Sequence, residues 1–175
     1  MPSSLNDNDL SFHRLVATVV ILNGNNEVCL IKEKRFISGK DIIRWTLPSG
    51  LIKFGEKLID GAIREVKEET NFSVQPTCLL GIIDWSKEHS ERLGSHSGHH
   101  GIDFIFGAKY LDGNPVPQHE EGILEILFVP IGNTDKFDLK DVYINAIKRF
   151  IKHDGLFLTN EVRDAFGYKY ADEYV

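Results

Sequence analysis

The segment from Leu58 to Thr70 constrains the fold more than any other stretch, because its apolar residues recur at helical spacing. An apolar residue falls every three or four positions, at Ile59, Ala62, Ile63 and Val66. This spacing predicts a helix with one buried stripe. Asn71 follows, and asparagine tolerates the left-handed backbone that ends many helices. We therefore predict a helix over 58–70 that packs on the rest of the chain through one side.

Three acidic residues of the same segment share a second face. Glu65, Glu68 and Glu69 stand at positions i, i+3 and i+4, so their carboxylates lie together next to the apolar stripe. Like charges at these spacings repel by about 0.2–0.5 kcal/mol per pair, and the negative end of the helix dipole adds to the cost. A divalent cation would turn this repulsion into attraction. On the glutamates alone, a solvated acidic face is an equally good interpretation.

The remaining chain alternates strand-like runs with one further helix. β-branched and aromatic residues predict strands at 13–22, 28–34, 44–47, 77–85, 102–111 and 123–130. The Asn-Gly-Asn-Asn turn at 23–26 predicts that the first two strands form a hairpin. Apolar spacing predicts a second helix at 141–152. Mixed strands with two helices indicate an α/β sandwich.

Length and charge narrow the class of protein. The 175 residues fit one domain over 1–175, with 1–11 as a flexible tail and 155–175 as a C-terminal extension. The net charge of −6 argues against a broad basic surface for duplex nucleic acid. The sequence lacks both an apolar run of about 20 residues and a recognisable signal peptide. We expect a cytoplasmic protein in which Cys29 and Cys78 are buried free thiols.

The glutamates belong to a longer pattern. Residues 50–72, GLIKFGEKLIDGAIREVKEETNF, resemble the Nudix box, G-x5-E-x7-R-E-U-x-E-E-x-G-U, in which U is bulky and apolar. The matching positions are Gly50, Glu56, Arg64, Glu65, Val66, Glu68, Glu69 and Phe72. Asn71 stands where the family has its last glycine. The preceding WTLPSG at 45–50 resembles the family's W-x-L-P-G-G, with Ser49 in place of the first glycine. By this resemblance the chain is identified as a member of the Nudix hydrolase family.

The resemblance implies a fold and a metal-dependent reaction. The fold is a Nudix-type α/β/α sandwich with a mixed sheet. Glu65, Glu68, Glu69 and the Gly50 carbonyl would bind Mg²⁺, with Mn²⁺ as an alternative. Glu56 and Arg64 would brace the loop before the helix, and we favour this role over that of an ordinary surface ion pair. The reaction is attack of water on phosphorus in a nucleoside diphosphate linked to another group, with Glu65, Glu68 and Arg64 in the catalytic machinery.

The base that activates the water stays open between two sources. In this family it comes from the box helix or from a later loop, where Glu120 and Glu121 precede the last strand. We favour Glu121 and expect Glu120, His119 and Lys34 to contact substrate. Solvation of a loop or of an exposed sheet face explains these residues equally well.

Other interpretations remain. His96, His99 and His100 form a polar loop that could bind zinc, but their spacing is irregular and no cysteine lies near. The residues do not select among nucleotide, nucleotide-sugar and dinucleoside polyphosphate substrates. A non-catalytic module that senses a nucleotide is the main alternative to an enzyme, and an isomerase of isoprenoid diphosphates is a third. We expect a small nucleotide as partner, no nucleic acid duplex and no membrane, and a homodimer is compatible with the sequence.

Overall fold

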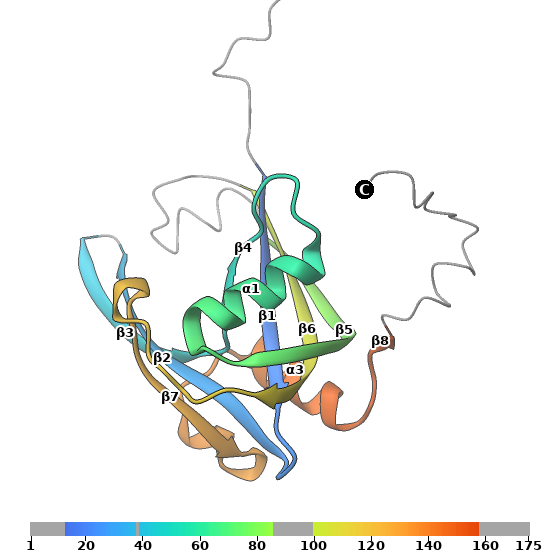
Figure 1. Ribbon diagram of the computed structural model, residues 1–175. Coiled ribbons are helices and arrows are strands. Elements are labelled where there is room, and N and C mark those ends of the chain that lie inside the picture. Colours follow the sequence, from blue (N-terminus) through green and yellow to red (C-terminus); the bar gives the residue numbers. More distant parts are fainter. Residues whose placement is uncertain (1–12, 38, 86–99, 158–175) are drawn as a thin grey trace, which may run out of the picture.

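A mixed sheet carries one helix on each face in the computed structural model, which describes residues 13–37, 39–85 and 100–157 (Figure 1). The helices are α1 (Leu58–Thr70) and α3 (Asp141–Ile151), with short 3-10 turns η2 (His119–Glu121) and η3 (Ile131–Lys136). The strands are β1 (Arg14–Leu22), β2 (Glu27–Ile37), β3 (Lys40–Thr46), β4 (Ser49–Leu51), β5 (Ser73–Trp85), β6 (Gly101–Asp112), β7 (Ile123–Pro130) and β8 (Leu156–Phe157). This arrangement confirms the predicted α/β/α sandwich.

Strand β1 lies at the centre and is buried on both faces. Its alternate residues Ala17, Val19 and Ile21 join the core cluster that contains Ala62 and Val66 of α1. The residue between, Val20, belongs to the second cluster, which contains Tyr143, Ala146 and Ile147 of α3. Since successive strand residues point to opposite faces, a nearly continuous apolar run, interrupted in β1 only by the buried Thr18, is what a strand between two helices requires.

The turn of the predicted hairpin is present, but the two strands that it joins hardly pair with each other. The Asn23 side chain accepts hydrogen bonds from the backbone N–H groups of Asn25 and Glu27, which closes the turn. Strands β1 and β2 then pair only at Leu22 and Val28. Beyond that pair β1 runs parallel to β6 and antiparallel to β4, whereas β2 pairs with β3 and β7.

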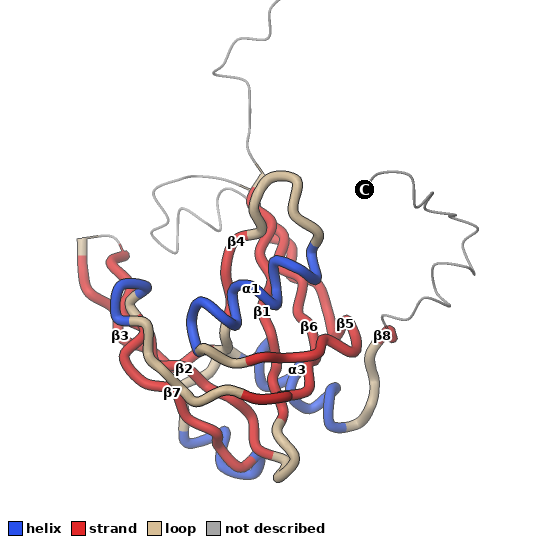
Figure 2. The backbone as a smooth tube through the Cα atoms, in the orientation of Figure 1, coloured by secondary structure: helices blue, strands red, loops and turns tan. Residues whose placement is uncertain are grey.

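β1 and β2 diverge beyond their single pair, and the chain from β3 to β4 lies between them (Figure 2). We call this arrangement the fork. β3 lies on β2 through pairs such as Ile31 with Thr46. After Leu47 and Pro48 the chain turns, and β4 lies on β1 through Thr18 with Ser49. The sequence predicted only a turn at 48–50, because a three-residue strand has no periodicity to detect. The corner of the fork sets the position of the candidate site.

Helix α1 has the predicted bounds but a different buried side. Asn71 ends it in the left-handed conformation, with φ 64°, so asparagine fills the position where the Nudix box has glycine. Ala62 and Val66 are fully buried as predicted, whereas Ile59 and Ile63 are 37% and 36% exposed. The stripe prediction is wrong for those two, because the helix is rotated to bury Glu69 instead.

Several other boundaries differ from expectation. β2 and β3 extend into the charged stretch that joins them, and β5 begins at Ser73 rather than 77 because register shifts around Pro76 accommodate a residue without an N–H group. β8 extends the sheet beside β5. The predicted tail at 1–11 and residues 158–175 of the predicted extension lie outside the described residues.

Two simpler features bear on the class of protein. Cys29 and Cys78 are free and buried, as expected. Within the described part of the chain, the helices are too short or too polar to cross a bilayer.

Candidate functional site

Gly50 and Glu65 bring strand β4 and helix α1 into contact. A Cβ built on Gly50 would overlap the carboxylate and Cγ of Glu65. Any other residue at position 50 would therefore push this side chain away. The backbone conformation of Gly50 is ordinary, so the missing Cβ matters here because it leaves space for the Glu65 side chain, and not because of a left-handed turn. The first glycine of the motif thus allows the Glu65 side chain to pack directly against the backbone of β4.

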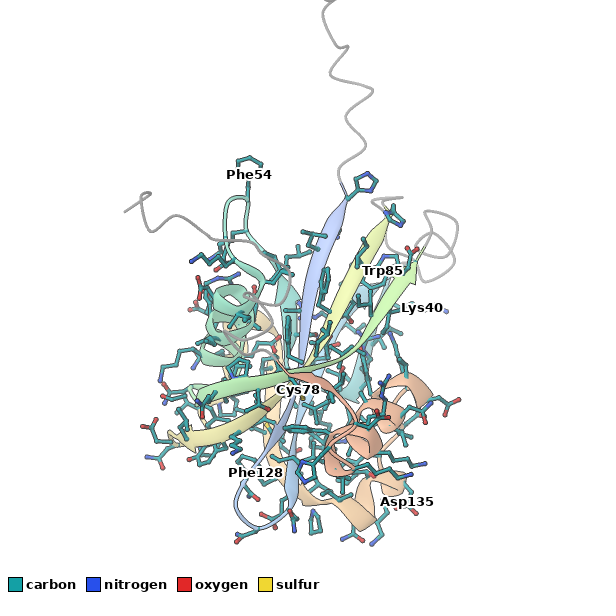
Figure 3. All side chains as sticks on the ribbon, turned by 90° about the vertical axis from the view of Figure 1, so that its right-hand side faces the viewer. Lys40, Phe54, Cys78, Trp85, Phe128 and Asp135 are labelled. Carbon is teal, nitrogen blue, oxygen red and sulfur yellow. The ribbon has the colours of Figure 1, made fainter. Side chains whose placement is uncertain are left out.

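The loop between β4 and α1 is held by Glu56 and Arg64. Arg64 donates to Glu56 from Nε and Nη2, both at 2.8 Å, and the Lys53 backbone N–H donates at 2.9 Å. These hydrogen bonds, led by those from Arg64, lower the pKa of Glu56 to about 2. Arg64 also donates to the Leu51 carbonyl at 2.9 Å. Above these contacts Phe54 points away from the body of the protein at the loop tip (Figure 3).

The same guanidinium also joins two of the three box glutamates. Nη1 of Arg64 lies 2.5 Å from Glu65 and 2.9 Å from Glu68. Lys53 approaches Glu68 at 3.5 Å. Three carboxylates around one guanidinium raise the pKa of Arg64, with Glu56 as the largest cause. A positive group therefore already lies between Glu65 and Glu68.

Glu69 differs from the other two because it is buried, with 3% of its surface exposed. It accepts a hydrogen bond of 2.8 Å from the backbone N–H of Ser49 at the corner of the fork. Burial raises its pKa to about 8, with Glu33 and Glu65 adding to the rise while the Ser49 hydrogen bond and Arg35 oppose it. A carboxyl group in this state gains from a nearby cation, since a positive charge removes the cost of ionising it.

A second charged group, which the sequence analysis missed, adjoins Glu69. Glu33 is 2% exposed and lies 2.7 Å from both Arg35 and Arg44. Arg35 also approaches Glu69, at 3.6 Å. Four consecutive charged residues at 32–35 inside a strand are a usable signal, because alternation must turn half of them toward the interior face.

The predicted metal ligands are neighbours without forming a closed metal site. Within residues 13–37, 39–85 and 100–157 no three His, Cys, Asp or Glu side chains converge as ligands. Arg64 lies between Glu65 and Glu68, and Glu69 faces Ser49. The oxygens are present, but the internal cation and the backbone hold them in other contacts.

The predicted substrate contacts lie near the C-terminal end of β2, beside β3 and the turn that precedes β7. Lys34 pairs with Asp41 at 2.7 Å, and its backbone N–H donates to the Gly122 carbonyl at 2.8 Å. That bond anchors turn η2, on which His119 and Glu120 are exposed. The Glu121 side chain lies outside the described residues. The segment before η2 crosses the end of α1, where the Val116 N–H donates to the Thr70 carbonyl at 3.2 Å.

The histidine loop is described only at its end. His96 and His99 lie outside the described residues. His100 contacts Asp84 at 2.6 Å through Nε2 and His13 at 2.8 Å through Nδ1. Both ring nitrogens of His100 therefore already have partners.

Comparison with known proteins agrees with the fold and the motif. A family model described as NUDIX domain matches residues 12–150. Nudix hydrolase 5 of Arabidopsis thaliana is 37% identical over 84 residues, which cover 47% of this chain and 26% of that protein. The chain thus matches about a quarter of that relative's length.

Solved structures show the same architecture. A NUDIX hydrolase from Nitrosomonas europaea superposes with a TM-score of 0.67 at 21% identity, covering 93% of this chain and 99% of the other. The NUDIX domain of Shewanella oneidensis NrtR, solved in complex with ADP-ribose, gives 0.65 at 14% identity and covers 85% and 93%. The family match over 12–150, the box geometry and the fold together place this chain in the NUDIX domain family.

Proposed function

We propose that this protein is a divalent-metal-dependent hydrolase that cleaves the pyrophosphate bond of a nucleoside diphosphate derivative by attack of water on phosphorus. The observation that carries the proposal is the set of carboxylates gathered at the start of β4 and the end of α1. The Glu65 side chain packs against Gly50, and Glu69 accepts a hydrogen bond from the Ser49 N–H. Arg64 donates hydrogen bonds to both Glu65 and Glu68.

The donor set fits a hard cation. Carboxylate and carbonyl oxygens are what Mg²⁺ and Mn²⁺ prefer, and the guanidinium of Arg64 lies where positive charge is already favourable. We propose Glu65, Glu68, Glu69 and the Gly50 carbonyl as the ligands, with Mg²⁺ the first choice. A bound divalent ion supplies neutralisation of the phosphate charge and acidifies a water molecule.

The side chains of this chain have separate tasks in the proposal. Arg64 keeps the loop before α1 closed through Glu56 and can give up its contact with Glu65 or Glu68 without releasing that loop. Glu69 keeps a proton near neutral pH until positive charge arrives, because burial raises its pKa to about 8. Arg35 and Arg44, held side by side by Glu33, bring positive charge toward the same corner. Positioning and electrostatics thus carry most of the catalysis.

The general base is proposed to come from the loop that carries η2. Glu121 is our candidate, with a box glutamate as its competitor. The anchoring of η2 to β2 by Lys34 supports a defined position for this loop. His119, Glu120 and Lys34 are the proposed substrate contacts, because they lie on or beside the same turn. We further propose a cytoplasmic protein that acts on a small nucleotide, as a monomer or homodimer.

The test is a phosphate-release screen with the whole chain and Mg²⁺, over nucleoside triphosphates, nucleotide sugars and dinucleoside polyphosphates. Glu68→Gln should lower turnover by at least about 100-fold, because it removes a charged ligand while keeping the side-chain shape. Asp60→Asn, an exposed acid in the first turn of the same helix, is the matched control and should keep full activity.

Two results would reject the proposal. Equal turnover in Glu68→Gln and Asp60→Asn would remove the box carboxylates from the reaction. Binding of a nucleotide without hydrolysis of any compound in the screen would favour the nucleotide-sensing alternative.

A further inference from the structure

His13 and His100 face each other at the end of the sheet where β1 and β6 begin. Their Nδ1 atoms lie 2.8 Å apart, although 87 positions separate the two histidines in the chain. The rings meet almost at right angles, with an interplanar angle of 89°. Two nitrogen lone pairs repel each other at this distance, so one proton must lie between the two atoms. The pair thus consists of two imidazole nitrogens that share a single proton.

The register of the sheet holds the two histidines together. The residues that follow them, Arg14 and Gly101, are partners in the parallel ladder of β1 and β6. The Arg14 backbone N–H donates to the His100 carbonyl at 2.9 Å. A Cβ on Gly101 would overlap the indole of Trp85, which lies at the end of β5 (Figure 3). The meeting of the two rings therefore follows from the pairing of three strands.

Asp84 on β5 determines which nitrogen of His100 can bind a cation. Its Oδ1 lies 2.6 Å from Nε2 of His100, and an ionised carboxylate can only accept a hydrogen bond. Nε2 therefore donates, which leaves the lone pair of the neutral ring on Nδ1, the atom that faces His13. Histidines that bind metal ions are commonly oriented by a carboxylate in this way.

We propose that His13 and His100 bind a zinc ion through their two Nδ1 atoms. The ion takes the place of the shared proton, which passes to solvent, and each nitrogen then donates its lone pair to the metal. Zn–N bonds are about 2.0–2.1 Å long, so two ligands of a tetrahedral site lie about 3.3 Å apart. The exposed ring of His13 therefore needs to move by only about 0.5 Å. Among the described residues no third His, Cys, Asp or Glu completes the group, and water fills the remaining positions.

This site differs from the box carboxylates in chemistry and in place. Imidazole nitrogens suit Zn²⁺, whereas Mg²⁺ prefers oxygen ligands. His13 precedes Ala17, the partner of Gly50, by a distance of about 13 Å along an extended strand. The inference therefore goes beyond the proposed function. The role of the ion is structural, because it joins the starts of β1 and β6 and, through Asp84, the end of β5.

The test is a calorimetric titration of Zn²⁺ into the whole chain, freed of metal beforehand and kept in excess Mg²⁺ so that the oxygen ligands are occupied. His13→Gln and His100→Gln should each weaken Zn²⁺ binding by at least about 10-fold, since loss of an outer partner alone costs that much. Asp84→Ala should weaken it by about 10-fold for the latter reason. The double histidine variant should bind no more weakly than either single one, because one ion needs both nitrogens.

The matched control is His153→Asn. His153 is exposed and lies beyond α3. Its φ is 54°, and asparagine tolerates this left-handed conformation. The control should therefore fold normally and keep the Zn²⁺ affinity of the wild type. Thermal melts of all variants in EDTA should coincide with that of the wild type, which identifies any preparation that is not folded.

A second measurement reports the structural role of the ion. Zn²⁺ at about 100 times its dissociation constant should raise the Tm of the wild type by about 5–10 °C. The Tm of His13→Gln should not change at the same Zn²⁺ concentration. Binding without any rise in the Tm of the wild type would overturn the structural role.

The outcomes are independent of the hydrolysis screen. Loss of Zn²⁺ binding in His13→Gln and in His100→Gln, with full binding in His153→Asn, supports the site even when the screen is negative. Equal Zn²⁺ affinity in the wild type and either single histidine variant would overturn the pair as ligands. The absence of measurable Zn²⁺ binding to the wild type would overturn the site and leave the proposed function untouched.

Discussion

The Glu65 carboxylate lies on the face of Gly50 where any other residue would carry its Cβ. This contact fixes the first of the proposed metal ligands to a strand, and the strand is itself paired with β1 through Ala17. The position of Glu65 therefore depends on a missing side chain as much as on the helix that carries it.

Gly50→Ala should displace Glu65 and lower Mg²⁺-dependent turnover by about 100-fold or more, because a misplaced ligand group costs catalysis steeply. Turnover at saturating and limiting Mg²⁺ measures the effect. Gly24→Ala is the control, since a Cβ at Gly24 meets no atom within 4 Å. Full activity of Gly50→Ala at every Mg²⁺ concentration would separate Glu65 from the metal.

The hydrogen bonds between ionised Glu56 and Arg64 predict a loss of folding stability at low pH. The pKa of Glu56 falls from 4.5 to about 2 in the folded protein, so its contribution is present above pH 4.5 and is lost as the pH falls toward 2. Glu56→Gln should unfold more easily than the wild type at pH 6, and the difference should shrink by pH 3. Urea unfolding at both values checks this. A constant difference would contradict the ionised brace.

The raised pKa of Asp103 predicts the opposite dependence of folding stability on pH. Burial raises the pKa of this carboxyl from 3.8 to about 6 on folding, so the unfolded state ionises first and this group lowers stability as the pH rises from about 4 to 6. Asp103→Asn should remove that decline, which is at most roughly 3 kcal/mol at 1.36 kcal/mol per pKa unit. Unfolding free energies of both proteins between pH 4 and 7 measure it. Parallel curves would show that Asp103 is ionised normally.

Glu33 predicts a contrast between buried and exposed ion pairs. Glu33→Gln removes the charge that Arg35 and Arg44 share and should cost about 2 kcal/mol, the range for hydrogen bonds to charged groups. Glu125→Gln removes a half-exposed partner that lies 3.6 Å from Lys32 and should cost less than about 1 kcal/mol. Chemical denaturation compares the two. Equal costs would mean that the charge of Glu33 does not hold the arginines.

Sequence patterns predicted the elements with a clear period. The bounds of α1 and its Asn71 end agree with the structure, because apolar spacing and the αL preference of asparagine are local properties. The fork was missed, because β4 is too short to show alternation and its pairing depends on residues far away in the chain. The exposure of Ile59 and Ile63 was missed for a related reason. Spacing defines a stripe, but the partner surface decides which side of it is buried.

The residues of the candidate site likewise divide into those that the sequence could predict and those that it could not. The box residues were found because their spacing is contiguous and resembles a family pattern. Glu33, Arg44 and Asp103 were not found, because the role of each comes from neighbours on other strands. The four charges at 32–35 were the available signal, and alternation along β2 would have placed Glu33 with Arg35.

The fork also links the buried polar residues on one face of the sheet to the proposed metal ligands on the other. Thr18 donates to Asp103 on the α3 side of β1 and pairs with Ser49, whose backbone N–H donates to Glu69 on the α1 side. A substitution that shifts Thr18 should therefore also move Ser49 and the carboxylate bound to it.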